Sequence, residues 1–221
     1  MTRLCKRVCS TCLLIALLGG VCLLCGCAAV AVIDRAIPKS IDAQYKGLAG
    51  QKVAVMVWAP LGARIDYPNL QKDTATSVQA YLIAKADEDE FKLTQYPWEA
   101  RSVVRFQKEH PETEAQAVAE YAPRISGITR LIYVEIGEFA TRSETTVQLL
   151  KGNMLGNVKV VEIKDGKATT TFQRNGVRVQ YPRKSKEGVI DVPESVIYRE
   201  TVGAFALEVA QLFYGHVIEE D

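Results

Sequence analysis

The sequence predicts one α/β domain, three-layer-like, with a mixed β-sheet, helices packed on it and a long C-terminal amphipathic helix. Three observations predict this fold. The stretches 52–58 and 130–139 are short, nearly continuously apolar and rich in valine and isoleucine, as buried strands are. Stretches with helical periodicity lie between them. Alternating stretches then flank Asp165-Gly166, a favourable hairpin turn, and a long helical stripe follows.

Each expected element has its own local signal. Asn69 is a plausible helix cap, and Pro97 ends an alternating stretch of the kind that strands show. Pro111 separates two helical stretches, and Pro193 opens the last helix. The region 141–157, with Gly152 to Gly156 in it, carries little regular pattern and is expected to be a variable loop. The expected elements are strands at 52–58, 91–96, 130–139, 158–163, 168–172 and 177–181, and helices at 70–85, 98–110, 112–125 and 194–217.

The cysteines are confined to the start of the chain. All six lie at or before Cys27, so the remainder has no thiol for a disulfide, for catalysis or for a metal. The rest of the chain is long enough for one domain, and its own apolar core must stabilise it.

The charges of the chain are balanced. Without Arg3, Lys6 and Arg7 the chain has 24 basic and 26 acidic residues. This balance gives no support for nucleic-acid binding.

The first 27 residues have the layout of a bacterial secretory signal. A basic start precedes an apolar run from Leu13 to Leu24, and Gly26 stands before Cys27. The end of this run resembles the lipobox of bacterial lipoproteins, although alanine or serine is usual where Cys25 stands. The resemblance implies lipidation of Cys27, including palmitate. We therefore expect a signal peptide at 1–26, a lipidated tether at 27–50 and an envelope domain at 51–221.

An uncleaved membrane anchor is the alternative. No charge interrupts residues 12–33, and a spanning helix needs only about 20 apolar residues. Both interpretations place the domain outside the cytoplasm, in the cell envelope. A lipoprotein of this kind is expected at the outer membrane facing the periplasm, and the sequence leaves the inner membrane open as well.

The order of elements resembles a group of envelope lipoprotein domains. The group comprises the curli-secretion channel lipoprotein, the lipoprotein activators of penicillin-binding proteins and the amino-terminal domain of the Tol-system periplasmic protein. The likeness covers roughly residues 45–217 and is carried by 47–55 (GLAGQKVAV), 128–139 (ITRLIYVEIGEF) and 158–163 (VKVVEI). These motifs are strand patterns of low to moderate specificity. The resemblance implies a scaffolding, docking or assembly role without catalysis.

Few residues suggest chemistry. His110, with Glu114 four residues on, and His216, with Glu220, are too few donors for a closed metal site. Glu135 and Glu138 are expected on opposite faces of a strand, which disfavours a carboxylate pair. Trp58 is expected in the core. There is one basic cluster, and it is expected to lie in a solvated loop. It consists of Arg178, Arg183, Lys184 and Lys186.

The expected function is that of a membrane-anchored envelope lipoprotein, a non-catalytic protein-binding accessory in envelope assembly or regulation. Its expected partners are the membrane, through the lipid, and another envelope protein, but no nucleic acid. No cofactor is expected apart from the covalent lipid on Cys27, and the oligomeric state stays open. Two alternatives are a subunit of an outer-membrane secretion channel and an uncleaved, membrane-anchored protein with an enzymatic role. Long alternating hairpins would be needed for the channel, and 157–164 and 167–173 look too short.

Overall fold

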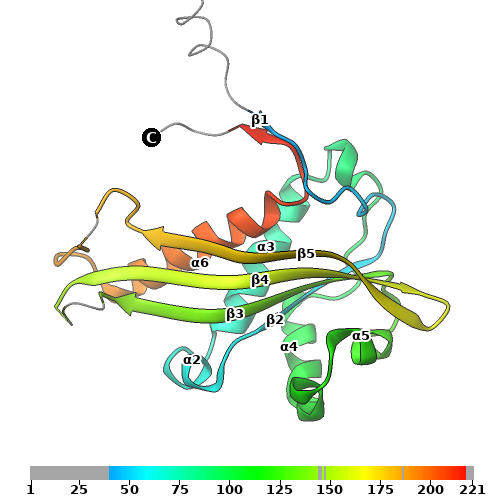
Figure 1. Ribbon diagram of the computed structural model, residues 1–221, viewed down its shortest axis with the longest axis horizontal. Coiled ribbons are helices and arrows are strands. Elements are labelled where there is room, and N and C mark those ends of the chain that lie inside the picture. The colour runs from blue at the N-terminus through cyan, green and yellow to red at the C-terminus, as the bar shows by residue number, and fades with distance from the viewer. Residues whose placement is uncertain (1–39, 144–145, 147, 186, 218–221) are drawn as a thin grey trace, which may run out of the picture. The chain divides into compact units, whose positions relative to one another are not determined.

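The computed structural model describes residues 40–143, 146, 148–185 and 187–217 (Figure 1). The predicted signal peptide, the lipidation site Cys27 and Lys186 lie outside the described residues. The chain divides into two compact units. The larger unit, Asp42–Gly215, carries the α/β fold. The described part of the smaller unit is two short antiparallel strands, β1 (Ser40–Ile41) and β6 (His216–Val217).

An open four-stranded sheet forms the centre of the larger unit, with the order β2-β3-β4-β5 (Figure 1). β2 (Val53–Trp58) is parallel to β3 (Arg130–Arg142), and it is buried along its whole length. β4 (Leu150–Lys164) and β5 (Lys167–Tyr181) follow in antiparallel pairing. The mixed sheet confirms the fold class predicted from the sequence.

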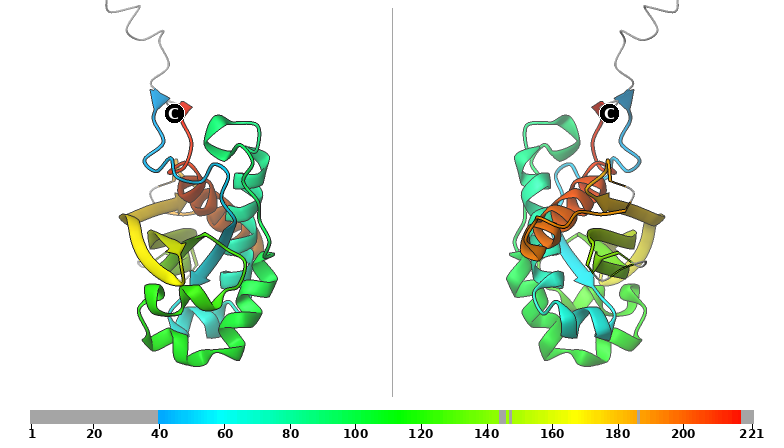
Figure 2. Two further views of the ribbon diagram at one scale, coloured as in Figure 1. Left: turned by 90° about the vertical axis from the view of Figure 1, so that its right-hand side faces the viewer. Right: turned by 90° about the vertical axis from the view of Figure 1, so that its left-hand side faces the viewer.

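Helices lie on both faces of the sheet (Figure 2). On one face, α3 (Leu70–Ala84) and α6 (Glu194–Ala210) share a core with the inward side chains of all four strands. On the other face, α4 (Ala100–Glu109) and α5 (Val118–Tyr121) pack against β2 and the beginning of β3. None of the described helices is both long and apolar enough to cross a bilayer. The shorter helices are α2 (Leu61–Asp66), η1 (Asp89–Phe91), η2 (Pro111–Ala115) and η3 (Ala122–Arg124).

The chain before β2 packs on the core of the larger unit. Leu48 is buried, and the backbone N–H groups of Gln44 and Tyr45 both donate to the carbonyl of Leu212, at 2.9 and 3.1 Å. The ring of Tyr45 meets Phe213 edge to face, with centroids 6.1 Å apart. Tyr45 thus packs on the domain.

The predicted strand at 91–96 is wrong. Phe91 ends the 3-10 helix η1 and is buried, and Leu93 has a left-handed φ of 61°. A residue in that conformation reverses the chain, so the apolar alternation does not extend into a strand. Gln95 makes one isolated parallel bridge to Lys52.

Two predicted helices are shorter in the structure. The stretch 112–125 forms η2, α5 and η3 in place of one helix, because Gln116 and Ala117 are extended and Pro123 lacks the N–H that would continue α5. The last helix opens after Pro193 as predicted but ends at Ala210, with Gln211 as its cap and Leu212 buried beyond it.

The predicted variable loop at 141–157 is wrong over its second half, because β4 begins at Leu150. The glycines there make room for α6 and are not turn residues. A Cβ atom on Gly156 would lie 2.8 Å from Cζ of Phe205, and one on Gly152 would meet Thr201.

The turn at Asp165 and Gly166 is confirmed, with φ of 53° and 73°. The two short strands expected after it are one strand, β5, interrupted by a bulge at Gly176.

Candidate functional site

The two edges of the sheet differ in how their backbone groups are used. The outer edge of β2 is hydrogen-bonded at both ends, and every residue of β2 is buried. The N–H of Val53 donates to the carbonyl of Gln95 at 2.8 Å, and the N–H of Gln95 donates to the backbone carbonyl of Gln51 at 2.9 Å. At the other end of β2, the carbonyl of Val57 accepts from the side-chain amides of Gln71 (2.7 Å) and Gln107 (3.0 Å). These bonds leave little of this edge for another strand.

β5 is the open edge. Among the described residues it pairs only with β4, and most of its fifteen residues are exposed. Its pairing is irregular in two places, near Thr171 and near Asn175 and Gly176. The N–H of Gly176 turns to the side chain of Asn157, at 3.1 Å. The longest regular stretch of β5 is therefore Val177–Tyr181, which we call the β5 edge.

The direction of the backbone groups at the β5 edge follows from strand alternation. Leu150 and Val189 exchange both backbone hydrogen bonds, at 2.8 and 2.9 Å, so the polar groups of Leu150 point toward the β5 side of β4. At the far end of β4, the N–H of Ile163 donates to the backbone carbonyl of Thr129 on the β3 side. β4 has an extra residue relative to β3 between Leu150 and Asn153, so alternation is counted from Ile163. Counted from Ile163, the even-numbered residues of β4 point toward β5.

This assignment settles which groups of the β5 edge are free. Val177, Val179 and Tyr181 stand opposite Gly156, Met154 and Gly152, which are even-numbered, and bond to them. The N–H and C=O groups of Arg178 and Gln180 consequently point away from the sheet. Unpaired groups of this kind are a template for another strand.

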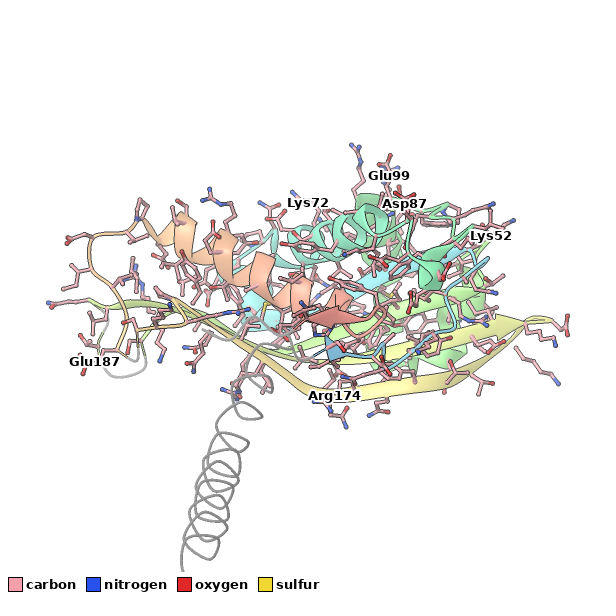
Figure 3. All side chains as sticks on the ribbon, turned by 90° about the horizontal axis from the view of Figure 1, so that it is seen from above. Lys52, Lys72, Asp87, Glu99, Arg174 and Glu187 are labelled. Atoms are coloured by element: carbon pink, nitrogen blue, oxygen red, sulfur yellow. The ribbon has the colours of Figure 1, made fainter. Side chains whose placement is uncertain are left out.

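The charge of β5 has one sign. Lys167, Arg174 and Arg178 lie on it, and Lys167–Tyr181 contains no aspartate or glutamate. Figure 3 shows Arg174 projecting from the strand. Arg178 lies 3.6 Å from Glu138, and its side chain is still 53% exposed. The basic cluster expected in a loop is thus partly on an edge strand, while Arg183 pairs with Glu208 at 3.6 Å.

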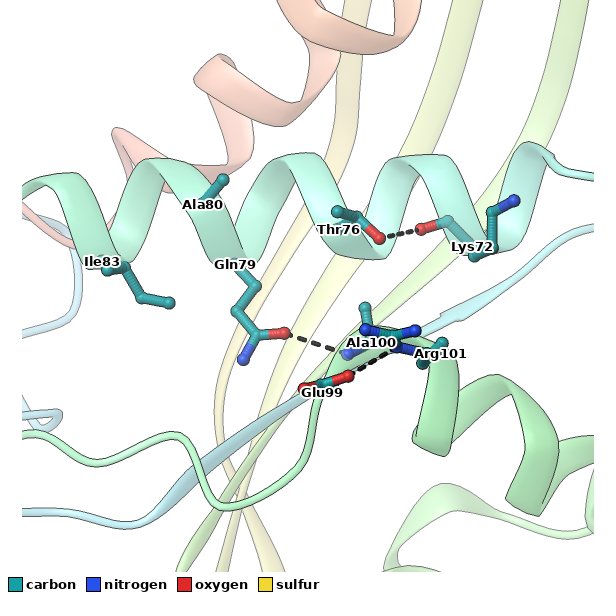
Figure 4. A pocket seen from close by; sticks show the side chains of 8 residues that line it. All are labelled: Lys72, Thr76, Gln79, Ala80, Ile83, Glu99, Ala100 and Arg101. Carbon is teal, nitrogen blue, oxygen red and sulfur yellow. Dashed lines mark hydrogen bonds and ion pairs between the residues drawn. The ribbon is translucent and has the colours of Figure 1, made fainter.

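A cavity of about 480 Å³ lies between α3 and the start of α4 (Figure 4). Ala80, Ile83 and Ala100 supply apolar lining. The polar groups around it bind one another, because Gln79 accepts from the N–H of Ala100 at 3.0 Å and Arg101 pairs with Glu99 at 2.5 Å.

A second cavity, of about 350 Å³, lies at the end of β2, beside the middle of β3. Trp58, Tyr133, Glu114 and Glu135 line it. Glu114 is paired with Arg64 at 2.5 Å, and the Arg64 guanidinium lies 5.4 Å from the Trp58 ring centroid. Burial raises the pKa of the Tyr133 hydroxyl, and Tyr121 and Glu135 nearby raise it further, so this phenol stays protonated at neutral pH. Trp58 is buried, as predicted.

The candidate carboxylate pair is arranged differently from the prediction. Glu135 stands opposite Asn157 and Glu138 opposite Leu155, and these two β4 residues share a face. The register shift between Ile136 and Glu138 inserts an extra residue, so both glutamates lie on one face and the expectation of opposite faces is wrong. Glu138 nevertheless pairs with Arg178 and not with Glu135.

Neither histidine is among the residues that line these cavities. Nδ1 of His110 lies 3.2 Å from Glu112, and Glu114, the partner considered from the sequence, pairs with Arg64. His216 lies in the smaller unit, and Glu220 is outside the described residues. Within the part of the chain that is described, no group of three or more His, Cys, Asp or Glu side chains could hold a metal ion.

No protein-family model and no curated protein matches the chain. Solved structures do show likeness. A PelC dodecamer from Paraburkholderia phytofirmans has a TM-score of 0.42 and 9% identity, with 80% of this chain and 98% of that chain covered. The lipoprotein GNA1162 from Neisseria meningitidis has a TM-score of 0.38 and 12% identity, with 72% and 96% covered.

The hypothetical protein CT253 from Chlamydia trachomatis has a TM-score of 0.36 and 18% identity, and 72% of this chain and 98% of that chain are covered. The solved structures to which the chain is similar thus include a bacterial lipoprotein. All three TM-scores are low, and the function proposed below depends on this chain's own residues.

Proposed function

We propose that the protein is a lipid-anchored envelope protein that binds another envelope protein and catalyses no reaction itself. The observation that carries the proposal is the contrast between the edges of the sheet. The edge at β2 is hydrogen-bonded at both ends and buried along its length, and the β5 edge is open and exposed. Extended segments of other proteins add to open edges through backbone hydrogen bonds. The basic start, the apolar run and Gly26-Cys27 supply the membrane anchor.

A non-catalytic role is supported by the pairing of the charged groups around the cavities. Glu114 is neutralised by Arg64, and Glu99 by Arg101. A general acid or base needs a proton-transfer group within reach of a substrate and a pKa suited to the task. Glu135 is exposed, and no thiol follows Cys27 in the sequence.

Strand length does not exclude the secretion-channel alternative. β4 and β5 have fifteen residues each, so the prediction that these strands are too short is wrong. The burial of their apolar face counts against a membrane-spanning role instead. Val158, Val160, Val177 and Val179 are buried in one core with Phe205 of α6. Side chains that pack on a helix cannot also form a lipid-facing row.

The anchor is tested by replacing Cys27 with alanine. Without the thiol no lipid is attached, so the protein should leave the membrane fraction or accumulate as a larger, unprocessed precursor. Cell fractionation with immunoblotting and mass spectrometry of the N-terminal peptide measures both outcomes. A Cys25→Ala variant is the matched control and should behave as the wild type. Normal lipidation of the Cys27→Ala protein would refute the assignment of Cys27.

Protein binding is tested by crosslinking in intact cells. A photoreactive residue in place of Gln180, whose backbone lies on the open edge, should give a discrete adduct with one protein. The same residue in place of Glu99, which Figure 3 shows on the side of the molecule opposite Arg174 of β5, should not. Equal labelling at both positions, or no adduct at either, would refute the proposal.

A further inference from the structure

The β5 edge has features that select its occupant. We infer that Val177–Tyr181 accepts a β-strand of a different protein, with apolar side chains toward α6 and carboxylates on the opposite face. This inference deepens the proposed function and depends on it for the biological partner. Three features of β5 support it: the direction of its backbone groups, its charge and the environment of each of its faces.

The backbone supports one added strand at this position. Arg178 and Gln180 direct their N–H and C=O groups outward, so a partner strand completes up to four hydrogen bonds with these two residues. The bulges near Thr171 and Gly176 interrupt the rest of β5. Bulges and cations are the devices by which edges resist unspecific pairing. The regular stretch between Val177 and Tyr181 is the part that these devices leave open.

The charge of the edge favours carboxylates in the partner. In one row across the sheet stand Glu138 on β3, Leu155 on β4 and Arg178 on β5. The next position in that row belongs to the added strand. A guanidinium has five N–H donors, and the single contact of 3.6 Å with Glu138 leaves most of them for a second carboxylate. Opposite charges on neighbouring strands stabilise their pairing.

The two faces of the edge require different side chains in the partner. Val177 and Val179 face the core that includes α6, whereas Arg178 and Gln180 are exposed on the opposite face. Side chains of an added strand alternate in the same way. The matching pattern is an apolar residue beside each valine and an acidic or polar residue beside Arg178.

A second copy of this chain does not satisfy these requirements. Pairing of two β5 edges would bring Arg178 of one copy to the vicinity of the same arginine in the other, with Arg174 close by in both. No aspartate or glutamate of β5 could offset this repulsion, because Lys167–Tyr181 contains none. Like charges on facing strands are destabilising. The observations therefore favour an acidic strand of another protein.

The test uses the full-length lipidated protein in detergent micelles and fluorescent peptides. A short peptide alternating valine and glutamate should bind, as measured by fluorescence anisotropy, and one alternating valine and lysine should bind at least about tenfold more weakly. Gln180→Pro removes an outward N–H and leaves the bonds to β4 in place. It should weaken binding by about three- to tenfold, the effect of one hydrogen bond.

Two variants complete the test. Gln180→Ala removes the side chain but keeps the N–H, so it should bind the glutamate peptide as the wild type does. Arg178→Glu should reverse the preference between the two peptides, and it keeps the experiment decisive if the proline variant does not fold. Circular dichroism and sedimentation measure the folding and the oligomeric state of each variant.

The outcomes separate this inference from the proposed function. No binding of the glutamate peptide, or equal binding by Gln180→Pro and wild type, would overturn the inference. Self-association through β5 that Gln180→Pro abolishes would overturn it in favour of a second copy. Crosslinking to a cellular protein at position 180 would still support the proposed function in either case. Peptide binding without any crosslinked protein in cells would leave the inference standing and count against the proposed function.

Discussion

Replacing Phe205 with alanine is expected to lower the free energy of unfolding by about 3–5 kcal/mol, the usual cost of removing a large core side chain. Phe205 is fully buried in the second half of α6 and belongs to the core that α6 shares with the sheet. Its ring lies against Gly156 so closely that a Cβ atom there would be 2.8 Å from Cζ. The backbone of β4 cannot readily move into the space that the ring would leave, because β4 is hydrogen-bonded on both sides.

Urea denaturation followed by circular dichroism measures this effect, and Leu93→Ala is its control. Leu93 is 81% exposed, so its truncation should change the stability by no more than about 0.5 kcal/mol. A domain is stable by only about 5–15 kcal/mol, so the expected loss at Phe205 is a large part of the total. If the two variants had the same midpoint, α6 would not be packed on the sheet as described.

The elements with strong hydrophobic patterns were predictable from the sequence. β2 and the first part of β3 are nearly continuous apolar runs, and they are buried by helices on both faces. The stripe that includes Ile197, Val202 and Phe205 identifies the buried side of α6. In each case the residues of one element determine its burial, so no knowledge of its neighbours is needed.

The first half of β4 was not predictable in this way. Its outward positions hold Lys151, Asn153 and Asn157, and two of its inward positions hold glycine, which usually indicates a turn. The inward glycines are explained only by α6, whose Thr201 and Phe205 occupy the space where their side chains would be. A local pattern does not contain that information.

The candidate site depends on strand order more than on residue type. Arg178 is one of several basic residues in its neighbourhood, and the sequence does not tell an edge strand from a central one. The closure of β2 depends on Gln71 and Gln107, which are distant in the sequence and meet at the carbonyl of Val57. The contrast between the two edges becomes visible only when the sheet is assembled.

Replacing Gly152 with alanine is expected to destabilise the fold by about 1–3 kcal/mol, as overpacking of a core does. The new Cβ atom would overlap Oγ1 of Thr201 and lie 2.9 Å from its Cβ. Thr201 is fully buried, and its hydroxyl donates to the carbonyl of Ile197 at 2.6 Å. Rotation of the hydroxyl away from the new methyl group would leave a buried polar group without its partner, which is itself costly. The strand and the helix must therefore move apart.

A double-mutant cycle with Thr201 distinguishes this clash from a general effect of the substitution. Thr201→Ala removes the nearest atom, so Gly152→Ala should cost less in that background by about 0.5–3 kcal/mol. Thr201→Ser keeps Oγ1 and should relieve little. Gly203→Ala is the matched control, because no atom lies within 4 Å of its new Cβ and alanine favours a helix, so stability should rise by up to about 1 kcal/mol. Urea midpoints of the set measure these differences. Additive effects of Gly152→Ala and Thr201→Ala would show that α6 does not meet β4 at this contact.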